Sequence, residues 1–129
     1  MTSRTRRLAV ACAVAFLGSG LTAPAAFSGQ SQRIDTAGGF ASFADTDEIL
    51  RVNDERAEGY RVVAQLRLRD GAVPISEVTD RDGANDEPNS NDLEIAERTK
   101  LSLRLCYEER LNTGAYVIVD CSGWQNAQA

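Results

Sequence analysis

Two cysteines in the last quarter of the chain, Cys106 and Cys121, are the residues best suited to forming a covalent bond. The third, Cys12, lies in an N-terminal segment that we expect to be removed. An oxidising exterior favours joining the remaining two. Their wide spacing lacks the Cys-x-x-Cys arrangement that activates a redox thiol. We therefore predict a structural disulfide between Cys106 and Cys121.

Catalytic chemistry is restricted because the chain contains no histidine. Histidine is the commonest general base at neutral pH and the commonest metal ligand. Ser-His-Asp and Cys-His mechanisms are therefore excluded. Paired carboxylates of the glycosidase kind are the alternative, since the chain has 19 Asp and Glu residues. We expect a protein without enzymatic activity and without a cofactor.

A polar loop is expected over residues 80–92, where five acidic side chains alternate with Gly, Asn and Pro. Asp80 and its neighbours carry hard oxygen donors of the kind that bind calcium. The spacing differs from that of a calcium loop, because Gly83 stands fourth and Ala84 replaces a donor. The composition therefore favours a solvated loop, with a calcium site as the alternative.

Three aromatic residues near the C-terminus, Tyr107, Tyr116 and Trp124, lie near one another if the last two strands form a hairpin. Exposed aromatics stack on sugars or anchor protein partners. Core packing is the alternative, and we expect it for Tyr116. We expect Trp124 to cap one end of the fold.

The first 25 residues have the pattern of an export signal. Arginines at positions 4, 6 and 7 precede the apolar run Leu8–Leu17, which is too short to span a bilayer. Ala23 and Ala25 fit the small-x-small cleavage rule, so we predict a cut after Ala25 and a secreted, extracellular protein. Cleavage would change the formal charge from -5 to -8 by removing three arginines and no acids. Such a charge disfavours nucleic acid and anionic membranes as partners.

Two strands are predicted in the first half of the domain. Ile49–Val52 is short, whereas residues 60–68 alternate apolar and polar side chains as in a half-buried strand. The polar stretch between them suits a turn, so we expect a hairpin. Residues 73–78 predict an edge strand interrupted by Pro74.

The C-terminal part predicts a second hairpin. Residues 101–107 alternate as a strand, and residues 93–100 are open to a helix. A turn over residues 112–114 leads into residues 115–121, whose continuous apolar run is typical of a central strand covered on both sides. An antiparallel hairpin through this turn brings the two cysteines opposite each other.

Residues 26–44 show neither a strand nor a helix period and are mostly Ser, Gly, Gln, Thr and Ala. We expect a flexible N-terminal tail whose large apolar residues, Ile34, Phe40 and Phe43, dock on a partner. A disordered leader with no binding role is the alternative. Residues 45–129 then form one all-β domain, a small antiparallel β-sandwich of about five or six strands with one disulfide.

Four segments carry a resemblance to a known group of proteins: Ile49–Asp54, the strand that starts at Tyr60, Arg104–Glu108 and Asp120–Trp124. They resemble the small secreted β-sandwich proteins abundant in actinobacteria, whose last strands read valine-cysteine-glutamate and cysteine-serine-x-tryptophan. In that family the first strand commonly ends in another cysteine, bonded to one in the loop. Here Asn53 takes that position and the loop has no cysteine, which indicates that the whole bridge was lost.

The chain also resembles the small adaptor subunit of umbrella toxin particles. That resemblance implies a tail that engages a repeat-containing toxin stalk and a globular part that holds a secreted lectin. We therefore expect a secreted, non-enzymatic protein-protein interaction module, with such an adaptor as its specific form. The alternative is a secreted hydrolase inhibitor that acts through the loop of residues 80–92.

Overall fold

The computed structural model describes residues 29–57 and 59–129. The predicted signal peptide, residues 1–25, lies outside this part of the chain. None of the described residues belongs to a helix that could span a membrane. They form nine strands: β1 (Gln32–Thr36), β2 (Gly39–Ala44), β3 (Ile49–Asp54), β4 (Tyr60–Leu68), β5 (Pro74–Thr79), β6 (Asn89–Asp92), β7 (Lys100–Arg110), β8 (Tyr116–Cys121) and β9 (Gln125–Gln128).

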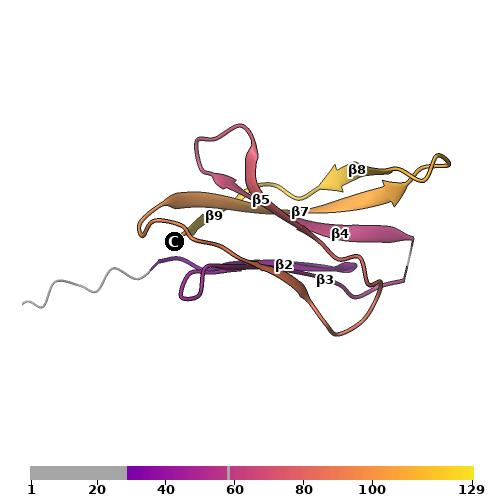
Figure 1. Cartoon of the computed structure of the whole chain (residues 1–129), viewed down its shortest axis with the longest axis horizontal. Coiled ribbons are helices and arrows are strands. Elements are labelled where there is room, and N and C mark those ends of the chain that lie inside the picture. Colours follow the sequence, from indigo (N-terminus) through magenta and orange to yellow (C-terminus); the bar gives the residue numbers. More distant parts are fainter. Residues whose placement is uncertain (1–28, 58) are drawn as a thin grey trace, which may run out of the picture.

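The strands form two antiparallel sheets that pack face to face (Figure 1). The four-stranded sheet has the order β1-β2-β3-β6. The five-stranded sheet has the order β5-β4-β7-β8, and β9 pairs with β7 beside β8. The predicted all-β sandwich with one disulfide is confirmed, with nine described strands in place of five or six.

The core lies between the sheets and follows the two-residue alternation of the strands. On β4 the core-facing parity is Val62, Ala64 and Leu66, as the sequence pattern predicts. Leucines 101, 103 and 105 of β7 share the same face of the sheet, and β7 contacts β2 and β1 of the other layer. Their burial is the main driving force for packing the two layers together.

The expectation of a flexible tail over residues 26–44 is wrong where the chain forms β1 and β2. These two strands pair with each other, and β2 also pairs with β3. Ile34 and Phe43 are buried in the core, so neither is exposed for a partner. The sequence hides the strand period because small residues, Gly39 and Ala41, hold buried positions of β2. A Cβ on Gly39 would lie 2.0 Å from the carbonyl oxygen of Asn53, so this position needs glycine.

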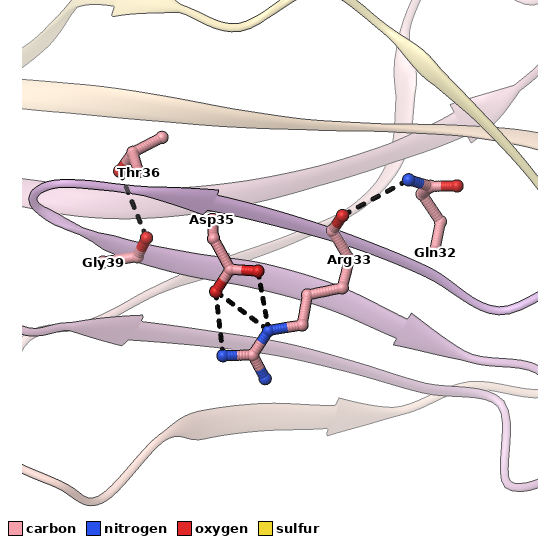
Figure 2. Close-up of polar contacts among 5 residues, drawn as sticks. All are labelled: Gln32, Arg33, Asp35, Thr36 and Gly39. Atoms are coloured by element: carbon pink, nitrogen blue, oxygen red, sulfur yellow. Dashed lines mark hydrogen bonds and ion pairs between the residues drawn. The ribbon is translucent and has the colours of Figure 1, made fainter.

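Phe40, the third residue predicted to bind a partner, is half-buried on the outer side of β2. The guanidinium carbon of Arg33 lies 3.8 Å from the centre of its ring. The same guanidinium forms a 3.0 Å ion pair with Asp35 (Figure 2). Thr36 donates to the carbonyl of Gly39 across the turn that joins the two strands. Phe40 thus belongs to an ordered hairpin.

The predicted hairpin between the strands at 49–54 and 60–68 is also wrong. β3 belongs to the four-stranded sheet and β4 to the five-stranded sheet, so the connection between them crosses from one layer to the other. Asp80, which follows β5, links the layers at this point. Its buried carboxylate accepts a 2.7 Å hydrogen bond from the backbone N–H of Asp54.

Two further local expectations fail. Residues 93–99 form no helix, because the backbone N–H groups of Leu93 and Ile95 donate to Glu48, which continues the pairing of β3 with β6. The loop of residues 80–92 is polar as predicted, yet Asp80 is completely buried and residues 89–92 form β6. A polar residue enters the interior here because backbone donors satisfy its carboxylate.

Candidate functional site

The hairpin of β7 and β8 carries the predicted disulfide. Cys106 lies directly opposite Cys121, with 4.0 Å between their Cα atoms, and the two sulfurs are bonded. The turn between the strands contains Gly114 with a φ of 86°, a backbone conformation that favours glycine. The disulfide therefore holds β8 against β7 at the end that leads into β9.

β8 is an edge strand, which corrects the prediction of a central strand covered on both sides. Val117, Ile118 and Val119 remain 38%, 42% and 47% exposed. The reason lies in the path of the chain after Cys121. The next strand, β9, pairs with the first half of β7 on the side where β8 pairs with the second half. Within the described residues, no strand is left to pair with the free side of β8.

Residues from the other sheet cover the β9 part of this edge. The backbone N–H of Gln30 donates to the carbonyl of Gln128, and the N–H of Gln128 donates back to Gln30. The side chain of Gln32 adds a hydrogen bond to that of Gln125. Residues 30–32, at the entry to β1, therefore close β9, and this cover does not extend to β8.

The opposite edge of the five-stranded sheet is also covered. Asn89 and Asn91 of β6 donate side-chain N–H groups to the backbone carbonyls of Thr79 and Glu77 on β5, at 3.0 and 3.3 Å. These bonds occupy acceptors that an edge strand otherwise presents to solvent. Among the described strands of the five-stranded sheet, β8 thus has the least protected edge.

A pocket of about 250 Å³ lies beside β8, lined by Tyr60, Tyr107, Val119 and Asp120. The two tyrosine rings meet edge to face, with 6.3 Å between their centres. The hydroxyl of Tyr107 shares a 2.5 Å hydrogen bond with that of Thr36. Tyr107 is held from both layers, so its ring forms a fixed wall of the pocket.

The outer face of the five-stranded sheet carries arginines stacked on aromatic rings. The Arg61 guanidinium lies 3.5 Å from the centre of the Tyr116 ring. Trp124 is contacted by both Arg67 and Arg104, at 4.0 and 4.4 Å. Such contacts stabilise exposed rings by about 0.5–1 kcal/mol each. Tyr116 is therefore outside the core, and Trp124 covers the outer face instead of capping an end.

The three C-terminal aromatics thus do not form one cluster. Tyr107 faces the other sheet and packs against the core, whereas Tyr116 and Trp124 lie on the outer face. The sequence pattern marks Tyr107 as a candidate but not its ring partner Tyr60. Cross-strand pairing explains the contact, because Tyr107 pairs with Val62, two residues beyond Tyr60 on the same face of β4.

Comparison with protein-family models, curated proteins and solved structures finds no match to this chain. The resemblance to secreted actinobacterial sandwich proteins and to the toxin adaptor therefore stays a prediction.

One carboxylate on the outer face has a perturbed pKa. Partial burial raises the pKa of Glu108 above its ordinary value of 4.5, and the negative charge of Glu77 raises it further. Arg61 and Arg81 act in the opposite direction. Glu108 pairs with Ile118 across the hairpin, whereas the charges that shift its pKa come from β4, β5 and the loop after β5.

The acidic loop shows no arrangement that would bind a metal. Asp80 uses its two carboxylate oxygens as acceptors for the backbone N–H groups of Asp54 and Asp82. The part of the chain that the structure describes contains no group of three or more Cys, Asp or Glu side chains that could hold a metal ion. Asp80 therefore has a structural role at the junction of the two sheets.

Proposed function

We propose that this protein is a secreted, non-enzymatic interaction module that binds an extended segment of another protein along β8. One observation carries the proposal. Val117, Ile118 and Val119 are exposed in succession on β8. The free edge of this strand pairs with no other described strand. Both the backbone and the apolar side chains of β8 are therefore accessible to a partner.

Strand addition is the binding mode that uses both features. An edge strand offers unpaired N–H and C=O groups, and natural proteins usually protect such edges with charge, proline or a cover. A partner in extended conformation satisfies these groups by backbone hydrogen bonds, and its alternate side chains provide specificity. β8 has neither lysine nor proline, and its only charged residue is Asp120. Its pairing with β7 shifts register at Val119, which has no partner on β7.

The disulfide supports both parts of the proposal. A bond between Cys106 and Cys121 is formed and kept in oxidising surroundings, which is consistent with an extracellular protein. It also fixes one end of β8 before a partner arrives. Ordering the strand in advance lowers the entropy that association must overcome.

The adaptor role is the specific form of this function that the resemblance implies. An adaptor needs two binding surfaces, and the β8 edge would supply one of them, for a stalk or for a lectin. The first expectation placed stalk binding on Ile34, Phe40 and Phe43. With Ile34 and Phe43 in the core, we propose that a partner is held by the β8 edge instead.

A matched pair of isoleucine variants tests the proposed edge. Ile118 on β8 and Ile75 on β5 are 42% and 49% exposed, and both lie on edge strands of the same sheet. Ile118→Lys places a charge on the β8 edge, opposite Glu108, which can pair with it and preserve the hairpin. Ile75→Lys makes the same change on the covered edge and is the control.

The probe is a phage-displayed library of random peptides, selected on the wild-type protein and measured as free synthetic peptides by calorimetry. We expect peptides that bind wild type and Ile75→Lys equally and Ile118→Lys about tenfold more weakly or worse. N-methylation at alternate peptide positions should abolish binding in one parity only, because strand addition uses alternate backbone groups. Equal binding to both variants, or a stable dimer of the protein alone with no peptide selected, would overturn the proposal.

A further inference from the structure

The pocket beside β8 opens on the side of the sheet that faces the other layer. Asp120 pairs with Tyr107, whose ring packs against the core, so both side chains lie on that inner face. On β4, Tyr60 lies on the same face, two residues before Val62, which is the partner of Tyr107. Tyr60 is 40% exposed. The pocket therefore adjoins the β8 edge on a defined side of the strand.

The lining of the pocket is aromatic and acidic. Two tyrosine rings and Val119 provide apolar walls, and Asp120 provides a carboxylate. Within residues 29–57 and 59–129, the Asp120 side chain has no hydrogen bond or ion pair. The next charged side chain on this face of β7 is Glu109, which pairs with Tyr60 and with Val117.

A cationic side chain with an apolar stem matches this lining. Lysine and arginine bury their methylene chains against apolar surface and keep the charged head near a carboxylate. Tyrosine faces attract such cations, and the attraction strengthens with partial desolvation. The chain also carries a formal net charge of -5, which favours the approach of basic segments.

The hydroxyl of Tyr107 adds a further restriction. Thr36 donates its own proton to Gly39, so Tyr107 donates to Thr36 and its hydroxyl can only accept a hydrogen bond from a ligand. This wall therefore offers a ligand the ring face and an acceptor oxygen, and no donor. A flat π surface beside a carboxylate selects positive charge over neutral hydrogen-bonding groups.

We propose that the pocket of Tyr60, Tyr107, Val119 and Asp120 is a specificity site for one lysine or arginine side chain of the extended partner. This inference rests on the proposed strand addition at β8. A partner strand paired with β8 directs every second side chain to the inner face. The residue that reaches Val119 and Asp120 enters the pocket, and its inner-face neighbours lie two positions away on either side.

The test uses two synthetic peptides that alternate valine and threonine and differ in one central residue, lysine or norleucine. Norleucine keeps the apolar stem and removes the charge. We expect wild type to bind the lysine peptide about tenfold more tightly, which is the combined scale of one cation–π contact and one partly exposed ion pair. Asp120→Asn and Tyr60→Leu should each reduce that ratio, because each removes one source of the preference for the charged side chain.

Tyr60 and Asp120 are at the surface, so the variants at these positions are expected to fold. Glu109→Gln is the matched charge control on the same face. Equal affinity of wild type for the two peptides would overturn the lysine site and leave strand addition intact. If neither peptide binds, or if Ile118→Lys binds both as wild type does, strand addition fails. The pocket is then tested alone by NMR with N-acetyl-lysine-methylamide. This compound should shift the ring resonances of Tyr60 and Tyr107 in wild type and not in Asp120→Asn. Absence of that shift in wild type would overturn the site as well.

Discussion

The five-stranded sheet ends in two different edge strands, β5 and β8. The β5 edge begins with Pro74, carries Glu77 in its middle and has two backbone carbonyls bonded to asparagine side chains of β6. The β8 edge exposes three successive apolar residues, and among the described residues no side chain is seen to cap it. One sheet thus has one edge covered by side chains of β6 and one edge, with a register shift at Val119, that no described strand covers.

The difference shows that exposed apolar residues alone do not make a binding edge. Ile75 on β5 is at least as exposed as any single residue in the apolar run of β8. It stands between Pro74 and Ser76, however, and the asparagines of β6 occupy neighbouring acceptors of the strand. A partner strand needs side-chain contacts and free backbone groups together, and β8 provides both.

The largest expected effect comes from removing the disulfide that fixes β8. The double variant Cys106→Ala, Cys121→Ala opens a loop with a sequence separation of 15. The chain-entropy model gives a loss of about 3 kcal/mol in the free energy of unfolding. Urea denaturation measures this loss, and hydrogen exchange should show faster opening of β8 than of β5. Equal acceleration at both edges, or a loss below about 1 kcal/mol, would count against a specific role in holding β8.

A smaller effect is expected from uncovering β5. The double variant Asn89→Ala, Asn91→Ala removes two side-chain hydrogen bonds to β5 carbonyls, and we expect a loss of about 1–2 kcal/mol in the free energy of unfolding. Ser90 lies between them, is exposed, and its side chain forms no hydrogen bond within the described residues, so Ser90→Ala should stay within about 0.5 kcal/mol of wild type. Chemical denaturation compares the three proteins. If the double variant matches Ser90→Ala, the asparagines do not protect the edge.

The smallest effect concerns pH and Glu108, opposite Ile118. Because its pKa is raised in the folded chain, folding favours the protonated form. This contribution is fully present below the ordinary value of 4.5 and is lost as the pH rises through the raised pKa. Glu108→Gln should therefore be slightly more stable than wild type at pH 7, and the two should converge as the pH falls toward 4.5. Thermal unfolding across that range measures the difference, and a constant offset would contradict the assignment.

Sequence patterns predicted much of the five-stranded sheet. The alternation of residues 60–68 and 101–107 gave two strands with the correct inner face, and Pro74 marked an edge strand. The cysteine pair and the turn at residues 112–114 located the last hairpin. These features are local, because strand period and turn chemistry depend on residues close together in the chain.

Most of the four-stranded sheet and the pocket could not be predicted in the same way. The buried parity of β2 contains Gly39 and Ala41, which carry too little apolar surface to reveal a period. Tyr60 and Asp120 meet only because β4 and β8 flank β7, and neither is marked by its own neighbours in sequence. Contacts of this kind depend on the order of strands in the sheet, which the local residue pattern of a segment does not reveal.

The amino-acid sequence by itself determined that the domain is built from strands, that Cys106 pairs with Cys121 and which faces of β4 and β7 turn inward. Only the tertiary structure decided that Val117, Ile118 and Val119 lie at an edge. An apolar run has the same local preference for extended backbone whether its strand is central or peripheral. Its burial depends on whether another strand occupies the adjacent position, and here β9 pairs with the other half of β7 instead.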